Sequence, residues 1–288
     1  MDLLLFKIWV PKRWEKLEEG SSAPLPRTYR VNETAKFLHP GYQSAKLVRI
    51  EQNTADTKTY VFETQRPLYF RAGQYLTVGC KVGESFVARP YAISSAPKAG
   101  LSKILSVTVK KCGFFSGYLF DHAKVGDVFT VGDPSGEFCY EPIKDSKQVL
   151  ALAGGSGITP FYSMAQAISD GTEDFSLTIL YGAKTEADII FRKELDALVS
   201  DKIKVVYVLS DEKKEGVEHG FITAELIKKY ISGDFTVMMC GPGAMYTFAD
   251  SQLKAFNLPL KRVKKEANCV GERDVKDAEY TLTVHIGF

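Results

Sequence analysis

The sequence predicts an antiparallel β-barrel domain followed by an α/β domain with a parallel sheet. Three observations carry this prediction. The chain has 288 residues, more than one average domain contains. Residues 42 to about 140 form short β-rich runs separated by turns, and the following residues alternate buried strand patterns with helical ones. A hydrophobic content of 45% and a charged content of 25% are ordinary for a globular protein.

Residues 1–41 are expected to form an irregular leader. They hold a Gly-Ser-Ser stretch, one short helical pattern near Lys12 to Glu19, and the prolines Pro11, Pro24, Pro26 and Pro40. The apolar start, Met1 to Val10, is too short to span a bilayer and has no small-residue cleavage site. It is expected to pack on the protein's own surface, with a peripheral membrane contact as the alternative. The expected location is cytoplasmic.

The segment 42–142 predicts the barrel. Its strands are short, rich in β-branched and aromatic residues, and separated by turns that contain glycine. The predicted strands are Ala45 to Ile50, Thr59 to Glu63, Tyr75 to Val78, Ile104 to Lys110 and Val128 to Val131. Many short strands at such spacing are typical of an antiparallel barrel or sandwich.

The segment 143–268 predicts the α/β domain. Its first strand, Val149 to Ala153, is a continuous apolar run, which a strand covered on both faces requires. The later strands are Leu177 to Tyr181, Lys204 to Leu209, Phe235 to Met239 and Arg262 to Lys265, and helices are expected up to Val199, from Thr223 to Tyr230 and from Ala244 to Phe256. This alternation favours right-handed crossovers and a parallel sheet of about five strands. The boundary with the barrel is expected near Glu141 to Ser146.

A glycine-rich loop directly follows the strand Val149 to Ala153. It consists of Gly154, Gly155, Ser156, Gly157, Ile158, Thr159 and Pro160. Thr159 is expected to be the N-cap of the next helix, and Pro160 suits its first turn. Such a loop lets a pyrophosphate approach bare backbone N–H groups at the positive end of a helix. A tight strand-to-helix turn without a ligand is an equally good explanation of the loop taken alone.

A second feature favours the dinucleotide. The strand Phe235 to Met239 runs into Cys240, Gly241, Pro242 and Gly243, at the same edge of the predicted sheet as the glycine loop. Ligands of open parallel sheets bind outside the carboxyl ends of the strands. Cys240 is therefore expected beside a nicotinamide ring, or it is a small buried residue that fits next to glycines.

Composition argues against several classes of partner. The formal net charge is +2, so there is no general attraction to nucleic acid or to acidic membranes. The five cysteines lack C-x-x-C spacing, and no cluster of metal-ligating residues is apparent. Scattered cysteines in odd number favour a reducing compartment. We expect no metal ligands in this chain, no nucleic acid partner and no transmembrane segment.

Further motifs in the barrel complete an ordered set. They are Arg89-Pro90-Tyr91-Ala92-Ile93-Ser94-Ser95, Gly113-Phe114-Phe115-Ser116, Val125-Gly126-Asp127 and Asp133-Pro134-Ser135-Gly136-Glu137-Phe138. Together with the glycine loop and Cys240-Gly241-Pro242, this order resembles the ferredoxin–NADP reductase superfamily over about residues 43–268. The resemblance implies a flavin-binding barrel domain, 42–142, and a nucleotide-binding domain, 143–268.

The resemblance also assigns residues around the flavin, which is expected to be FAD rather than FMN. It implies that Arg89 binds a phosphate or the ring edge, since a guanidinium fork suits a phosphate, and that Tyr91 lies against the isoalloxazine. Ala92 stands where the family usually has serine or threonine near flavin N5. The segment Gly113 to Ser116, including Phe114 and Phe115, is expected to hold the phosphates through helix N–H groups and the Ser116 hydroxyl. Pro90, Ser94 and Val109 complete the expected flavin contacts.

On the nucleotide side, the family places the adenosine ribose against the strand Lys204 to Leu209, which runs into Ser210, Asp211 and Glu212. A carboxylate there accepts bonds from a free ribose hydroxyl and repels a 2′-phosphate, so NADH is favoured over NADPH. The expected contacts include Tyr181 and Gly182.

Thr159, Cys240 and Glu266 are the candidates for the wall around the reacting rings, with a plain surface charge as the alternative for Glu266. Asn268 replaces an aromatic residue common in the family.

Residues 269–288 are expected to be a linker and the start of a [2Fe–2S] ferredoxin domain. Tyr280 to Gly287 has the alternating pattern of that domain's first strand, and the C-x4-C-x2-C ligands of a cluster are absent. The hypothesis is a truncated three-part reductase like those that supply electrons to oxygenases, with an ordinary C-terminal strand as the alternative.

The sequence thus predicts an enzyme that moves hydride from NAD(P)H to FAD and then single electrons to an iron–sulfur centre or a protein such as a ferredoxin or oxygenase. Two alternatives stay open. One is a non-catalytic flavin relay whose nucleotide domain docks a partner. The other is a dinucleotide sensor without flavin, which Arg89 and Tyr91 disfavour.

Overall fold

A computed structural model describes residues 30–38 and 41–267 together with Gly20. The helix predicted near Lys12 and the strand predicted at Tyr280 to Gly287 lie outside the described residues. Within the leader, a helix that the sequence patterns did not predict, α2, spans Arg30–Leu38. Residues 1–37 and 38–288 are separate compact units, and the remaining description concerns the second. Across the part of the chain that the structure describes, no helix has the length and apolar character needed to cross a membrane.

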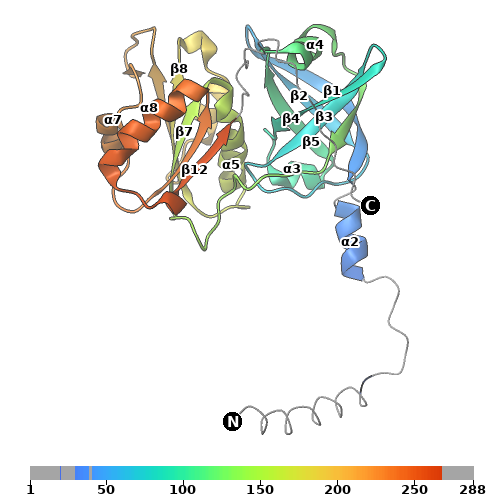
Figure 1. The fold of residues 1–288 in the computed structure, drawn as a ribbon, viewed down its shortest axis with the longest axis horizontal. Coiled ribbons are helices and arrows are strands. Elements are labelled where there is room, and N and C mark those ends of the chain that lie inside the picture. Colours follow the sequence, from blue (N-terminus) through green and yellow to red (C-terminus); the bar gives the residue numbers. More distant parts are fainter. Residues whose placement is uncertain (1–19, 21–29, 39–40, 268–288) are drawn as a thin grey trace, which may run out of the picture. The chain divides into compact units, whose positions relative to one another are not determined.

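The first domain is a six-stranded antiparallel sheet in the order β4-β3-β6-β1-β2-β5 (Figure 1). An isolated bridge between Ile93 and Val107 joins the ends of the sheet, so it closes on itself. Large apolar side chains, among them Leu47, Phe62 and Leu76, fill the interior. The strands are β1 (Tyr42–Thr54), β2 (Thr57–Thr64), β3 (Tyr75–Val82), β4 (Ser85–Ala92), β5 (Ile104–Lys110) and β6 (Val128–Gly132), with helices α3 (Pro97–Leu101) and α4 (Phe114–His122).

The sequence patterns predicted five of these strands and missed β4. None of the side chains in β4 is fully buried, so it lacks the apolar alternation that marks a half-buried strand. Strand β4 forms because its backbone pairs with β3, which is itself held on its other side by β6. The strand that carries Arg89 and Tyr91 therefore owes its conformation to pairing and not to its own composition.

The second domain is a six-stranded parallel sheet in the order β10-β9-β8-β7-β11-β12. The order and direction confirm the predicted α/β class, with a two-residue strand, β10, added to the five expected. The strands are β7 (Gln148–Gly154), β8 (Ser176–Ala183), β9 (Ile203–Leu209), β10 (Glu218–His219), β11 (Thr236–Gly241) and β12 (Val263–Ala267). The helices are α5 (Thr159–Ser169), α6 (Arg192–Leu198), α7 (Ala224–Tyr230) and α8 (Gly243–Leu253), with single 3-10 turns at Gly155–Ile158, Glu186–Asp188, Lys254–Phe256 and Leu260–Arg262.

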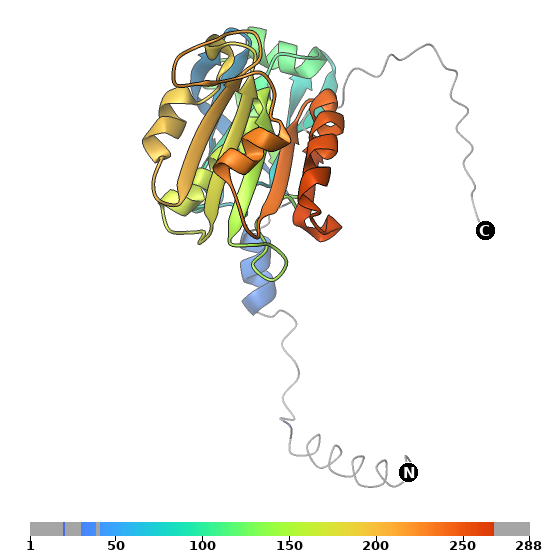
Figure 2. The same ribbon diagram turned by 90° about the vertical axis from the view of Figure 1, so that its left-hand side faces the viewer.

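Helices cover both faces of this sheet, and each face has its own apolar core. Phe161 and Leu195, from α5 and α6, pack on one face, while Ile227 and Leu253, from α7 and α8, pack on the other. Figure 2 shows α7 in front of the strands. Coverage on both sides explains why the central strand β7 reads as a continuous apolar run.

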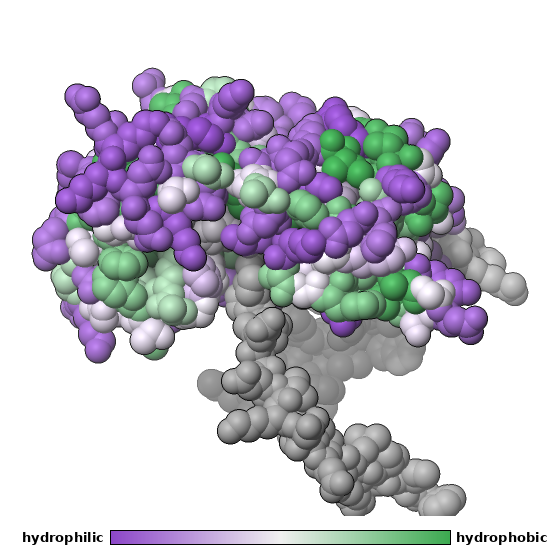
Figure 3. All heavy atoms as spheres, turned by 90° about the horizontal axis from the view of Figure 1, so that it is seen from above, coloured by the Kyte–Doolittle hydropathy of each residue, from purple (hydrophilic) through white to green (hydrophobic). Residues whose placement is uncertain are grey.

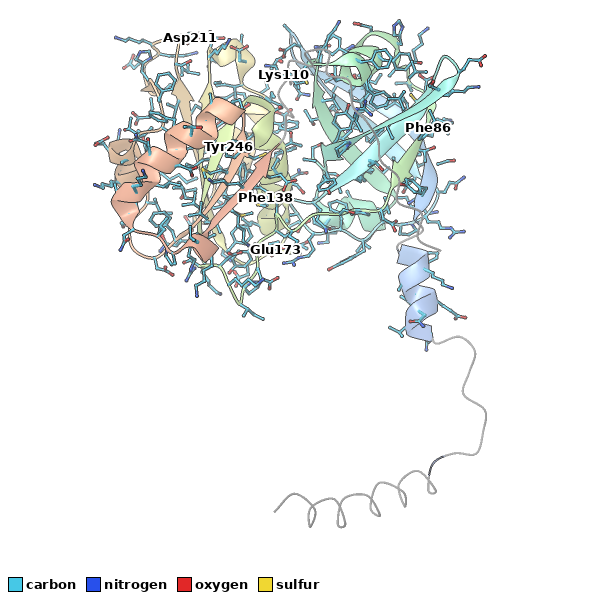
Figure 4. The ribbon with its side chains drawn as sticks, in the orientation of Figure 1. Phe86, Lys110, Phe138, Glu173, Asp211 and Tyr246 are labelled. Carbon is cyan, nitrogen blue, oxygen red and sulfur yellow. The ribbon has the colours of Figure 1, made fainter. Side chains whose placement is uncertain are left out.

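The barrel contributes side chains to the core on the α5 face. Ala72, Phe138 and Tyr140 are buried there together with Phe161 and Phe175, and Phe138 lies between the two sheets in Figure 4. The Phe138 and Phe161 rings meet edge to face at 5.7 Å, and Tyr140 stacks on Phe175 at 4.2 Å. The two sheets are therefore joined by a continuous apolar contact that holds α5 against the barrel.

Candidate active site

The glycine-rich loop joins β7 to α5 through a 3-10 turn, Gly155–Ile158. The prediction that Thr159 is the N-cap was wrong, because Ile158 takes that position and Thr159 is the first helical residue. The 3-10 turn takes up the four residues between β7 and α5, and the α-helix begins at Thr159, one residue earlier than an N-cap there would place it. Thr159 is 1% exposed, and its hydroxyl donates to the Ser156 carbonyl at 2.8 Å. Pro160 lies in the first helical turn, as predicted.

The glycines of this edge divide into two groups. A methyl group at Gly157 would lie 1.9 Å from the Cys240 carbonyl oxygen, and one at Gly154 or Gly241 would lie 2.7 Å from Met245 Sδ. These three glycines are needed for packing between β7, β11 and α8. A methyl group at Gly155 or Gly243 would meet nothing within 4 Å, and Gly155 has a φ of +53°. The bare backbone at these two positions is open to a ligand, which fits a pyrophosphate cradle.

Tyr181 holds the loop from inside the sheet. Its hydroxyl donates to the Gly155 carbonyl at 3.0 Å and accepts from the Ile190 amide at 3.1 Å. The side chain is fully buried, and this burial raises the pKa of the Tyr181 phenol far above its usual value. Tyr181 therefore fixes the Gly155 backbone, while its neighbour Gly182 pairs with Gly154 in the sheet.

Cys240 and Glu266, two of the three wall candidates, are register partners on β11 and β12. Cys240 is fully buried beneath the glycine loop, whereas Glu266 is half-buried, and burial raises the pKa of its carboxyl group. Tyr246, on α8 (Figure 4), accepts from the Gly241 amide at 3.2 Å and donates to the Glu266 backbone carbonyl. This contact locks the ends of β11 and β12 together. Thr159, the third wall candidate, lies two residues after Gly157. Gly157 packs directly on the Cys240 carbonyl.

On the barrel, Arg89 and Tyr91 lie near the end of β4. The Arg89 side chain is exposed, and its guanidinium donates to the Ala88 carbonyl at 2.8 Å, which leaves further donors for an anion. Tyr91 and Phe115 are near-parallel, at 6.5 Å and 26°. Burial raises the pKa of the Tyr91 phenol. Pro90 and Ala92 pair with Thr77 and Tyr75 on β3, so this part of β4 is held by the sheet.

The start of α4 forms the other part of the expected flavin site. Gly113 is the N-cap, and a methyl group there would meet nothing within 4 Å. Ser116 Oγ accepts from the amides of Cys112 and Gly113, at 3.0 and 2.9 Å, and donates to the Gly113 carbonyl at 3.1 Å. Because the Ser116 hydroxyl closes this cap, the backbone N–H groups of α4 are the donors left for a phosphate. Phe114, at 69% exposure, stands free beside them.

Two expected flavin residues have buried side chains. Ser94 is 1% exposed, and its hydroxyl shares a hydrogen bond of 2.8 Å with Ser106. Val109 is 2% exposed and lies in the barrel core. Neither buried side chain is accessible to a ligand, so the structure gives no support for the expected side-chain contacts with the flavin.

The expected ribose end lies at the carboxyl end of β9, where Figure 4 labels Asp211. Asp211 is exposed and accepts from the Ser210 hydroxyl at 2.6 Å. Glu212 accepts from the Glu186 amide at 2.8 Å, and Lys214 forms an ion pair with the Glu186 carboxylate. The carboxylates of Asp211 and Glu212 therefore lie at this end of the sheet, and the Lys214 ammonium group is paired with the carboxylate of Glu186.

Sequence reasoning missed an aromatic pair beside this edge. Phe221 follows β10, and Phe248 lies on α8; their rings are 5.7 Å apart. They are 67% and 36% exposed. The face of the molecule shown in Figure 3 carries large hydrophilic regions with several hydrophobic patches between them. The two rings are tilted by 52° and together expose an apolar, aromatic surface beside this edge. The signal in the sequence was Phe221 directly after Gly220, at the end of a strand, but its partner is remote in the chain.

A closed antiparallel barrel joined to a doubly covered parallel sheet, with anion donors on both, defines a dinucleotide-dependent flavoprotein oxidoreductase. The sequence matches the family models described as oxidoreductase FAD-binding domain, over residues 44–140, and oxidoreductase NAD-binding domain, over residues 151–251. The chain belongs to the ferredoxin–NADP reductase superfamily, and it is an NAD(P)H-dependent flavoprotein reductase of that type.

Similar proteins and a similar solved structure agree with this assignment. NADH-cytochrome b5 reductase 1 of Lodderomyces elongisporus is 32% identical, and the match covers 71% of each protein. The glycine betaine monooxygenase reductase subunit of Chromohalobacter salexigens is 27% identical over 84% of this chain and 71% of that protein. The crystal structure of the cytochrome b5 reductase domain of Ulva prolifera nitrate reductase has the same fold, with a TM-score of 0.69 at 24% identity, over 80% of this chain and 99% of that one.

Proposed function

We propose that the protein oxidises NADH in preference to NADPH, reduces FAD, and delivers electrons one at a time to an iron–sulfur centre or a protein acceptor. Bound FAD supplies the chemistry, because it takes up a hydride and releases single electrons. The observation that carries the proposal is the meeting of the two candidate sites. The strand of Arg89 and Tyr91 continues into Ser94, whose carbonyl accepts a hydrogen bond of 2.7 Å from Gln166 on α5, the helix that begins at the glycine loop.

The residues of the barrel fit the binding of FAD. Arg89 and the backbone N–H groups at the start of α4 supply donors for the phosphates. Tyr91, supported by Phe115, supplies an aromatic face for the ring system. The backbone at Ala92 takes the place of the hydroxyl usual at this position.

The residues of the parallel sheet fit the binding of a dinucleotide. The open backbone at Gly155 and Gly243 suits the pyrophosphate, and Phe221 with Phe248 suits the adenine. Of the three wall candidates, the half-buried Glu266 supplies the accessible side chain at the nicotinamide end, and the buried Thr159 and Cys240 support the backbone there, in a place from which water must be excluded. Because burial raises the pKa of the Glu266 carboxyl group, this group holds a proton more readily than a solvated glutamate and is suited to exchange one beside the reacting atoms.

The preference for NADH rests on charge. Asp211 accepts from the Ser210 hydroxyl through one oxygen and has its second oxygen left for a ribose hydroxyl. A 2′-phosphate at the same place would meet the carboxylates of Asp211 and Glu212. Glu212 is fixed by the Glu186 amide, at 2.8 Å. Lys214 would be the obvious phosphate partner, but it is paired with Glu186.

The acceptor is proposed from the class of the relatives. Their names describe reductases of cytochrome b5 and reductase subunits of a monooxygenase, all of which hand electrons to another protein. An iron–sulfur centre is one form of this proposed acceptor. Since a flavin can receive two electrons and release them singly, the same chain can serve either a haem or an iron–sulfur acceptor.

The test begins with the purified protein loaded with FAD. Its released flavin is identified by mass, and loss of flavin absorbance is followed after mixing with NADH or NADPH. We expect rapid bleaching with NADH, slower bleaching with NADPH, and reoxidation by cytochrome b5 or a [2Fe–2S] ferredoxin faster than by oxygen alone. A flavin that neither coenzyme bleaches would contradict the proposal, and equal rates with both would contradict the NADH preference.

A further inference from the structure

One face of α5 is directed at the barrel. Thr159, Ser163 and Gln166 are spaced by four and three residues, so they lie above one another on the same side of the helix. Thr159 begins the helix at the glycine loop. Ser163 is fully buried, one turn further on, and Gln166 is partly buried after that. The stripe therefore runs from the expected nicotinamide pocket down the seam between the two sheets.

Two of these side chains bond directly to the barrel backbone. Ser163 Oγ donates to the Ser95 carbonyl at 2.7 Å. Gln166 Nε2 donates to the Ser94 carbonyl at 2.7 Å, and also to the Tyr162 carbonyl of its own helix at 3.2 Å. Both acceptors are buried, with Ser94 at 1% and Ser95 at 8% exposure. Buried polar contacts of this kind are costly to leave unmade, so they define one relative position of the two elements.

The accepting carbonyls are themselves held by β5. The Ser94 amide donates to the Ser106 carbonyl at 2.8 Å, the two hydroxyls share a bond of 2.8 Å, and Ser95 Oγ accepts from the Ser106 amide at 3.1 Å. Ser94 and Ser95 follow Ala92 by two and three residues. A short rigid path therefore connects the position expected near flavin N5 with the helix that carries Thr159.

We propose that Ser163 and Gln166 are positioning residues for hydride transfer, which act by fixing α5, and with it the nicotinamide pocket, against the end of the flavin strand. This inference rests on the proposed function. Transfer between two rings depends steeply on distance and orientation, so a displacement of about 1 Å can cost about a hundredfold in rate. Binding of each cofactor depends on its own domain and is far less sensitive to such a displacement.

The test uses the FAD-loaded protein with Gln166→Ala and Ser163→Ala, singly and together. A cavity of about 220 Å³ already borders Gln166, so its truncation enlarges an existing space, and Ser163→Ala removes only the hydroxyl oxygen. Gln252→Ala is the matched control, because Gln252 is also a helical glutamine, and its Oε1 accepts from the Ala224 amide at 3.0 Å within the α/β domain alone.

Three quantities are measured: the limiting rate of flavin bleaching, the NADH dissociation constant, and hydrogen exchange of the amides in 94–106. For the double variant we expect the limiting rate to fall about tenfold or more, with an NADH dissociation constant within about twofold of the unmodified protein. A larger kinetic isotope effect with NADH deuterated at C4 would support a less well-aligned transfer. Exchange in 94–106 should rise in the variants, and the control should match the unmodified protein in every measurement.

The outcomes separate the two proposals. If NADH bleaches the unmodified protein and the double variant equally fast, the positioning role is wrong and the proposed function stands. If the NADH dissociation constant rises while the limiting rate of flavin bleaching stays unchanged, the residues serve binding, and the inference is likewise overturned. Unchanged exchange in 94–106 would contradict it whatever the activity. If NADH fails to bleach the unmodified protein, both proposals fail.

Discussion

Cys240 and Glu266 lie directly opposite each other on the parallel strands β11 and β12. Partners in register on parallel neighbours point to the same face of a sheet, so a buried thiol and a half-buried carboxyl group share the face that carries α5. The Tyr246 hydroxyl ties the ends of both strands. Glu266 is the acidic member of the three wall candidates, and the first prediction concerns its carboxyl group.

Glu266→Gln should make the protein more stable at neutral pH. Burial raises the folded-state pKa of this carboxyl group above its unfolded value. Its contribution is therefore most favourable below the unfolded pKa and is lost as the pH rises through the folded pKa. Thermal unfolding between pH 4 and 7 should show a melting temperature a few degrees higher for the variant at pH 7, and the difference should shrink toward pH 4. A difference between the variant and the unmodified protein that grows on acidification would contradict the prediction.

Gly157→Ala and Gly243→Ala should separate packing from ligand binding. The methyl group at Gly157 would lie 1.9 Å from the Cys240 carbonyl oxygen, so the backbone must move, and we expect a loss of about 3 kcal/mol in the free energy of unfolding. At Gly243 the methyl group meets nothing within 4 Å, so stability should change by less than about 1 kcal/mol while NADH binds several-fold more weakly. Urea unfolding and NADH titration measure both effects. Equal stability of the two variants would show that Gly157 is not needed for packing.

Tyr181→Phe should affect the glycine loop and leave the flavin in place. The change removes the partner of both the Gly155 carbonyl and the Ile190 amide. Leaving such groups unpaired costs about 1–3 kcal/mol, and the loop becomes less well ordered. Steady-state kinetics should show a KM for NADH raised several-fold, with an unchanged flavin content. Tyr230→Phe, on the opposite face of the sheet, is the control; a KM change of the same size there would argue against a specific role for Tyr181.

Asp211→Ala should shift the coenzyme preference toward NADPH. The exposed carboxylate no longer repels a 2′-phosphate, and a ribose acceptor for NADH is lost. We expect the ratio of kcat/KM for NADH to that for NADPH to fall about tenfold, which corresponds to about 1.4 kcal/mol. Asp201→Ala, at the other end of β9, removes the same charge far from the edge and should leave the ratio unchanged. A ratio that does not respond to Asp211→Ala would place the ribose elsewhere.

Lys264→Met should destabilise the connection between the domains. Asp145, in the segment between β6 and β7, is fully buried, and Lys264 on β12 pairs with it and donates to the Cys139 carbonyl at 2.8 Å. Removal of the lysine leaves a buried carboxylate without its charge partner, at a cost of about 3–5 kcal/mol in unfolding free energy. The double variant with Asp145→Asn should recover part of this loss in urea unfolding. No recovery would mean that the lysine acts through packing alone.

Some of the site was evident from local pattern. The apolar run of β7, the glycines after it and the motif around Arg89 are each contiguous, so neighbouring residues alone indicate a cradle and an anion donor. Phe221 and Phe248 could not be found this way, because one follows β10 and the other lies on α8, and only the folded chain brings their rings to 5.7 Å. Strand β4 was likewise invisible in composition, since pairing with β3 creates it.

The sequence by itself determined the two fold classes, their order along the chain and the edge of the parallel sheet at which the glycine-rich loop lies, because hydrophobic period and turn chemistry are local properties. Only the tertiary structure decided which glycines pack and which stay open, that Ile158 and not Thr159 caps α5, and that the Ser116 hydroxyl closes its own helix. It also decided that Ser163 and Gln166 meet the end of the flavin strand. Each of these depends on atoms from segments far apart in the chain, whose distance is set when two sheets bury a common apolar core.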